Sequence, residues 1–108
     1  MNTETILEQT TSFRDDLLKD LTDTEFAMYY LEAALADYKE DGNTDSLWIA
    51  LRDVVEAQGG IGKLAQRTKA DLQHLNDIFD AKQKPHLDNL QNILSGLGFQ
   101  IRLEFAEN

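Results

Sequence analysis

The sequence contains no cysteine, a single proline and six glycines among 108 residues. The missing cysteines exclude disulfides and thiolate metal sites, and we expect a protein of the reducing cytoplasm. No apolar run approaches the ~20 residues that a membrane-spanning helix needs. Residues 1–5 carry neither the basic nor the apolar region of a secretory signal, so we expect none. A chain of this length can form one domain and bury a core without cross-links.

Positive charge is also scarce, since ten Lys and Arg stand against twenty Asp and Glu, a net charge of −10. The whole excess lies in residues 1–58, with fourteen acidic and four basic side chains, whereas residues 59–108 hold six of each. Only between Lys63 and Lys84 do basic side chains outnumber acidic ones, five to three. Because a basic domain is the usual footprint of a DNA-binding protein, we expect a single chain to bind DNA weakly and in a salt-sensitive way.

Helical spacing of apolar residues predicts an all-α fold of about five helices, with residues 1–21 as an N-terminal arm or short helix and residues 22–105 as one domain. Thr22 and Glu25 have the spacing of a capping box, which predicts that a helix begins there. Its end is expected near Gly42, because glycine is the usual helix stop.

The next helix is expected from about Asp45 to Ala57, with Thr44 or Asp45 as its cap and Gly59-Gly60 after it. Trp48 is expected in the core or in a dimer contact. The buried stripe of this helix is predicted to hold Leu47, Ala50, Leu51, Val54 and Val55.

Two short helices follow, one at Ile61–Thr68 and one that begins at Asp71, joined by a tight link at Lys69-Ala70. Such a pair can form a helix-turn-helix, whose second helix enters the DNA major groove. A further helix begins at Pro85, which suits a first helical turn. The inward-facing candidates in the helix-turn-helix are Leu64, Ala65, Leu72, Leu75, Ile78 and Phe79.

The period of the apolar pattern changes to two at the end of the chain, which predicts a half-buried strand over residues 99–105. No other segment has this pattern, yet a strand needs partners for its amides and carbonyls. We therefore expect the same strand of a second copy to pair with it in a homodimer. The alternative is an extended tail that packs on its own helices. The predicted dimer strand carries Phe99, Ile101, Leu103 and Phe105.

Two motifs, Tyr30-Leu-Glu-Ala-Ala-Leu35 and Gly60-Ile-Gly-Lys-Leu-Ala-Gln-Arg-Thr68, resemble those of the addiction-module antidote proteins. These are small antitoxin-type regulators with a lambda-repressor-like helix-turn-helix. Pro85 and Leu97-Gly98-Phe99 fall at the matching spacing, and the resemblance covers about residues 22–105. It implies a cognate toxin as partner and autoregulation of a small operon. Toxins of such systems are often basic ribonucleases, and an acidic partner would suit them electrostatically.

The chain departs from the family pattern at four positions. Gly62 stands where the family usually has a helix-capping Ser, and Lys69 where its turn usually has Gly, a position that favours positive φ. Leu72 and Asp77 stand at an Arg-like and a Lys-like position of the second helix. Both of these changes remove positive charge from the side that would face the groove.

The resemblance and the spacing together nominate DNA contacts. Gln73 and His74 are the best base-reading candidates, since Gln pairs with adenine and His can donate to guanine. Asn76 lies further along, and Leu72 can either touch a thymine methyl group or pack inward. The alternative for Gln73 and His74 is an ordinary solvent-facing role. The phosphate candidates, which could equally be solvated surface side chains, are Lys63, Arg67, Lys69, Lys82 and Lys84.

Nothing in the sequence indicates catalysis. His74 and His86 are the only histidines and lie twelve residues apart, so we expect no metal site and no cofactor. No phosphate-binding loop or nucleophile motif occurs, and we expect no enzyme. The favoured hypothesis is a dimeric, DNA-binding transcriptional regulator of antitoxin type, which binds double-stranded DNA and a basic toxin. The rival is a protein-interaction module of the same fold that has lost DNA binding.

Overall fold

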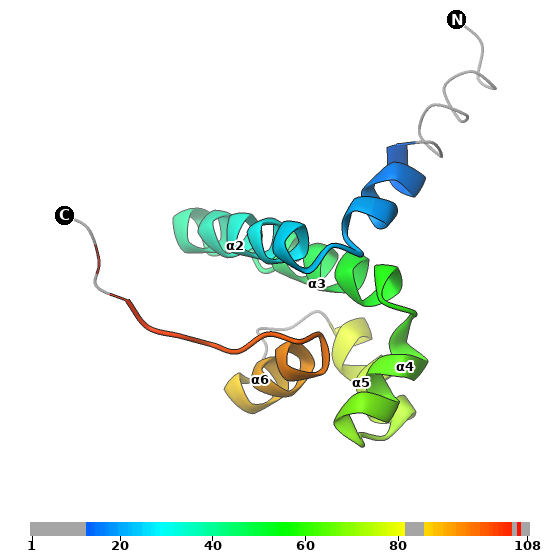
Figure 1. The fold of residues 1–108 in the computed structure, drawn as a ribbon. Helices are drawn as coiled ribbons and strands as arrows, with labels where there is room; N and C mark the ends of the chain where they lie inside the picture. The colour runs from blue at the N-terminus through cyan, green and yellow to red at the C-terminus, as the bar shows by residue number, and fades with distance from the viewer. Residues whose placement is uncertain (1–12, 82–85, 105, 107–108) are drawn as a thin grey trace, which may run out of the picture.

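The computed structural model describes residues 13–81, 86–104 and 106. In this part of the chain residues 13–20 are helical, and five further helices follow (Figure 1). The all-α class is confirmed, but these six helical segments exceed the expected count of about five. The five later helices are α2 (Thr24–Asp41), α3 (Asp45–Ala57), α4 (Ile61–Thr68), α5 (Leu72–Ala81) and α6 (Leu87–Gly96).

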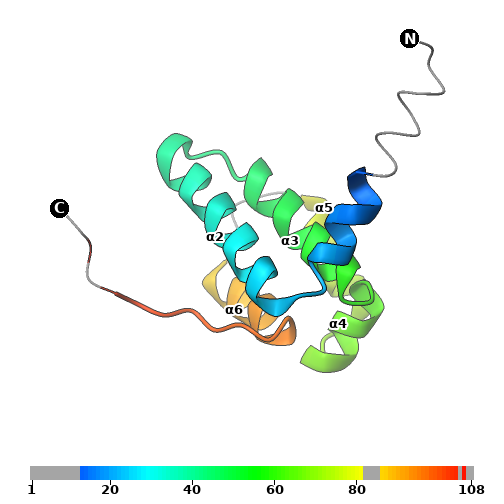
Figure 2. The ribbon, with the colours of Figure 1, turned by 45° about the horizontal axis from the view of Figure 1, so that its top comes forward.

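Two layers make up the described chain, with α2 and α3 side by side in one and α4, α5 and α6 in the other (Figures 1 and 2). The tight connection at Gly42, where φ is +74°, reverses the chain between α2 and α3. Its amide donates to the Tyr38 carbonyl at 2.7 Å, which closes α2 as a glycine in the left-handed region does. The predicted stripe of α3 is confirmed as buried, and Trp48 is buried with it.

The start of α2 differs from the predicted capping box. Asp23 is the N-cap, and its carboxylate accepts hydrogen bonds from the amides of Glu25 and Phe26 at 2.9 and 3.3 Å. The Thr22 hydroxyl instead donates to the Lys19 carbonyl at 2.6 Å. The prediction was wrong by one residue because a carboxylate is at least as good an N-cap as a hydroxyl and also meets the positive end of the helix dipole.

A buried carboxylate, Asp53 of α3, fastens the helical residues 13–20 to the body of the protein. Arg14 donates to it at 3.2 Å and to Glu56 at 2.5 Å, and the Tyr30 hydroxyl donates to it at 2.7 Å. Burial, reinforced by the hydrogen bond to Asp53, raises the pKa of Tyr30 to about 12. The hydrogen bond to Glu56, with that to Asp53 next, raises the pKa of Arg14. This cluster compensates the only buried charged residue of the described chain.

The second layer is held by a close approach of α4 and α6 at Gly96. A Cβ atom placed there would lie 2.5 Å from Leu64 Cδ1 and 2.7 Å from Thr68 Cγ2. Packing therefore favours glycine at this point, because a larger residue would fit only if the Leu64 and Thr68 side chains moved. Leu64 is buried in the same contact, as predicted.

The predicted C-terminal strand is absent from the described residues 99–104, which are extended but belong to no sheet. The sequence pattern indicates an extended backbone, but a strand exists only when another strand pairs with it, and the single chain supplies none in its described part. Phe99 packs against the core, whereas Ile101 is 45% and Leu103 93% exposed. Phe105, the last residue of the predicted strand, lies outside the described residues.

Candidate nucleic-acid interface

The link between α4 and α5 is a structured turn of three residues, 69–71. Lys69 has φ +57° and ψ +26°, and it is the only non-glycine residue of the described chain with positive φ. Its amide and the Ala70 amide both turn back to the Ala65 carbonyl. The Thr68 hydroxyl donates to the Leu64 carbonyl at 2.9 Å. The expectation that a lysine here occupies a glycine-like conformation is confirmed.

The start of α4 corrects a second expectation. Gly60, with φ +93°, is the N-cap residue, and Gly62 lies inside the helix. Gly62 therefore does not cap α4. The helix begins at Ile61, directly after Gly59-Gly60. Both glycines have positive φ, a backbone conformation that costs other L-residues free energy and that does not continue a helix.

The helix α5 exposes one edge along its length. Leu75 and Phe79 are buried against the core, whereas Gln73, His74 and Asp77 are exposed. Asp77 lies one helical turn from both Gln73 and His74, so the three side chains line one exposed edge of the helix. The edge that would have to meet a duplex is thus open to solvent.

Two side chains on the exposed edge of α5 form a hydrogen bond with each other. The Gln73 amide donates to the Asp77 carboxylate at 3.0 Å, so Gln73 can contact a base only after this bond opens or rearranges. Leu72, expected to face inward or to touch a base, is 45% exposed. Its exposure leaves the base contact open and makes the inward-packing prediction wrong.

Asn76, the remaining base-reading candidate, is half-buried on the flank of α5. It lines a shallow pocket of about 220 Å³ together with Arg52 and Glu56 of α3 and Gly60. This position turns Asn76 toward α3, away from the edge that carries Gln73 and His74. The structure therefore brings together Gln73, His74 and Asp77 but separates Asn76 from them.

The phosphate candidates occupy different environments. Lys63 and Lys69 are exposed at the two ends of α4. Arg67 is turned back onto the protein, where its guanidinium donates to the Gln58 side chain at 3.2 Å and to the Gly96 carbonyl at 3.5 Å. The Gln58 amide in turn donates to the Leu97 carbonyl at 3.4 Å. Lys82 and Lys84 lie outside the described residues.

Sequence reasoning missed these contacts of Arg67, which join the end of α4 to Gln58 after α3 and to Gly96 of α6. The partners are nine and 29 residues from Arg67 along the chain, and nothing in the local pattern marks them. It also missed the cluster around Asp53, whose partners lie 39 and 23 residues away. A charged residue inside the otherwise apolar stripe of α3 is the one signal that could have indicated it.

The described residues show neither a metal-binding group of three or more His, Cys, Asp or Glu side chains nor a helix long and apolar enough to cross a membrane. His74 is exposed on α5, and His86 precedes α6 as its N-cap residue.

No curated protein and no solved structure matches the chain. A family model described as "Probable addiction module antidote protein" matches residues 9–105. Because the match covers most of the chain, the protein belongs to this family of addiction-module antitoxins.

Proposed function

We propose that the protein is a transcriptional regulator of antitoxin type, which binds its operator as a homodimer through a helix-turn-helix formed by α4 and α5 and neutralises a cognate toxin. The observation that carries this proposal is the open edge of α5, where Gln73 and His74 stand just after the structured turn at Lys69. In a helix-turn-helix, the first residues of the second helix reach the base edges.

In this arrangement α5 lies in the major groove. Gln73 leaves Asp77 and makes two hydrogen bonds to an adenine, while His74 donates to a guanine. Lys63 and Lys69 contact phosphates on either side and fix the register of the helix. Two copies would read half-sites about one helical turn, roughly 34 Å, apart.

We place the proposed toxin contact on the acidic half of the chain. Residues 1–58 carry a net charge of −10, whereas residues 59–108 carry none. A basic toxin would be steered to α2 and α3 and away from α5, because complementary potentials raise the rate of encounter. DNA and toxin could then be held on separate layers of one molecule.

A gel-shift titration with the DNA upstream of the protein's own gene tests the regulator proposal. We expect retardation that weakens with salt, and roughly a 10-fold or greater loss of affinity in Gln73→Ala, because one bidentate base contact is worth about 1–3 kcal/mol. Gln91→Ala is the matched control, since Gln91 is an exposed glutamine on α6 outside the proposed interface. A folded dimer that gives no shift at low salt, or equal losses in both variants, would contradict the proposal.

One observation favours the rival function, a protein-interaction module without DNA binding. Asp77 and Asp80 are exposed on α5, and Asp77 both repels phosphate and holds the Gln73 amide. The variant Asp77→Asn separates the two functions. If α5 reads DNA, we expect the neutral amide to strengthen binding several-fold. If neither the wild type nor this variant shifts DNA, the interaction module is supported.

A further inference from the structure

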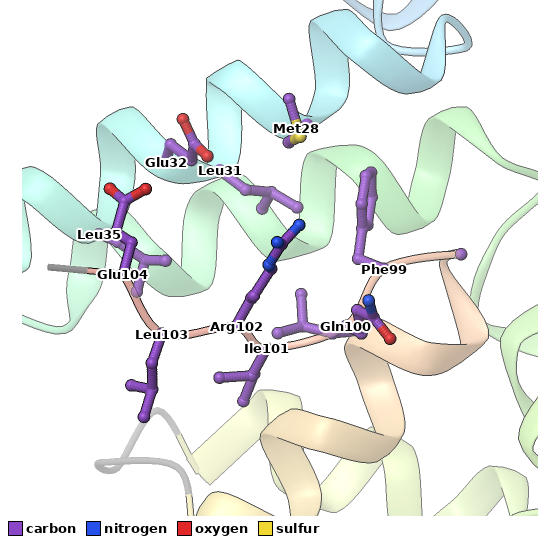
Figure 3. Close-up of a pocket in the computed structure, with 12 residues that line it drawn as sticks. Met28, Leu31, Glu32, Leu35, Phe99, Gln100, Ile101, Arg102, Leu103 and Glu104 are labelled. Atoms are coloured by element: carbon purple, nitrogen blue, oxygen red, sulfur yellow. The ribbon is translucent and has the colours of Figure 1, made fainter.

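The extended C-terminal segment, residues 99–104, offers an unpaired backbone. The Phe99 amide donates to the Leu94 carbonyl at 2.8 Å, but the described backbone of residues 100–104 makes no hydrogen bond within the chain. Unpaired edges of this kind are templates for another strand. Figure 3 shows Arg102 and Glu104 pointing toward α2, and Ile101 and Leu103 pointing to the opposite side.

A groove of about 730 Å³ separates this segment from α2. Its wall on α2 is mostly apolar, and Met28 and Leu35 are 36% and 42% exposed there. Leu31 lies between them and is buried. The open groove leaves space beside the segment, so α2 does not block the approach of a second strand.

In one antiparallel register, each charged side chain of the segment meets an opposite charge on the segment of a second copy. If two copies pair with Leu103 opposite its own symmetry mate, Arg102 of each copy faces Glu104 of the other. Shifting the centre to Arg102 or to Glu104 would instead place like charges opposite one another, which is destabilising. The same register gathers Leu103 and Ile101 of both copies on the face away from α2.

We propose that the occupant of this edge is a second copy of the chain. The two C-terminal segments pair as antiparallel strands about a two-fold axis at Leu103, with Arg102 of each copy beside Glu104 of the other and the Leu103 side chains of both copies in contact. This inference rests on the homodimer of the proposed function and specifies its interface. The strand predicted from the sequence then exists only in the dimer.

Complementary charge variants test the register. In Arg102→Glu every copy presents two acidic positions, and in Glu104→Arg two basic ones, so we expect each variant alone to dimerise about 10-fold more weakly. Mixing the two variants restores both cross-strand pairs, and the heterodimer should form with a Kd within about 3-fold of the wild-type Kd. Sedimentation equilibrium with one chain fluorescently labelled measures all three. The proposal would be overturned if either variant alone dimerised with the wild-type Kd, or if the mixture dimerised no more tightly than the single variants.

A cysteine placed on the axis gives a second readout. The chain has no cysteine, so Leu103→Cys introduces one thiol, at a side chain so exposed that the helices should be unaffected. The register places two such thiols opposite one another, and oxidation should give a disulfide-linked dimer at least 10-fold faster than in Ile101→Cys, the matched control on the same face. Equal rates in the two variants would contradict the pairing.

The two proposals fail separately. If DNA is shifted but the charge variants dimerise like the wild type, the regulator stands and its dimer uses another surface. If the charge mixture and the cysteine variants behave as expected but the upstream DNA is not shifted, the C-terminal pairing stands and the DNA-binding function fails.

Discussion

The acidic layer formed by α2 and α3 and the neutral layer formed by α4, α5 and α6 are built in different ways. The first consists of two long helices of 18 and 13 residues that are neighbours in sequence. It holds Asp53, the only buried carboxylate among the described residues, which accepts hydrogen bonds from Arg14 and Tyr30. The second consists of three helices of eight to ten residues and depends on the glycine contact between α4 and α6. Short helices have little stability of their own, so the second layer needs the first more than the reverse.

The layers meet where Phe79 of α5 packs on Trp48 of α3. The two rings are edge to face, 5.4 Å apart at an angle of 71°, and the Arg52 guanidinium lies 5.5 Å from the centre of the Phe79 ring. The candidate DNA-reading helix α5 therefore takes its position from the acidic layer.

Phe79→Ala should produce the largest effect, because it removes the ring that joins the layers and leaves a cavity. We expect a loss of about 3–5 kcal/mol in the free energy of unfolding, measured by urea denaturation. Leu72→Ala, on the same helix but 45% exposed, should cost less than about 1 kcal/mol. Similar losses in both variants would mean that α5 does not depend on α3.

Gly96→Ala tests the contact within the second layer. The added methyl group would meet Leu64 and Thr68 at distances that real side chains do not show, and we expect a loss of about 1–3 kcal/mol in urea denaturation. The control is Gly62→Ala, where a Cβ atom meets nothing within 4 Å and the helix should gain up to about 1 kcal/mol. The free energy of unfolding should therefore fall in Gly96→Ala and rise in Gly62→Ala.

The acidic layer should respond to high pH through Tyr30. Its pKa is raised from 10.0 to about 12, so the folded state favours the neutral phenol. This contribution is complete below pH 10 and is lost as the pH rises toward 12. We expect an extra fall on the order of 1–2 kcal/mol in the wild type relative to Tyr30→Phe over this interval, discounted because the side chain is only half-buried. Parallel stability curves for the two proteins would exclude this role.

Lys69→Gly should have the smallest effect on stability, and it should stabilise the protein, whereas Phe79→Ala and Gly96→Ala should destabilise it. Removing the side chain from a left-handed conformation relieves strain of about 1–2 kcal/mol, offset in part by the entropy of glycine in the unfolded chain. We expect a net gain below about 1 kcal/mol by thermal unfolding. Under the regulator proposal Lys69→Gly and Lys63→Gln each lose a phosphate contact and bind DNA more weakly, but only Lys69→Gly also relieves backbone strain. A destabilised Lys69→Gly would contradict the strain argument.

Local signals predicted much of the helical framework. Glycine breaks and apolar spacing gave α3 and α4 with the observed bounds, and they gave the buried stripe of α3, because these features act within a few residues. The family pattern also indicated the positive φ of Lys69. The strand predicted over residues 99–105 is absent from the described residues 99–104 of the single chain, since pairing depends on a partner that the local pattern cannot supply. The DNA contacts remain predictions.

The amino-acid sequence alone determined the all-α class, the helix breaks and the separation of acidic from neutral charge, since each follows from side-chain chemistry and short-range periodicity. Only the tertiary structure decided that Asp53 is buried with Arg14 and Tyr30, that Arg67 turns back onto Gln58, and that Leu103 is left exposed. Those outcomes depend on residues distant in the chain meeting in space, and the energy of such contacts exists only once the helices have packed.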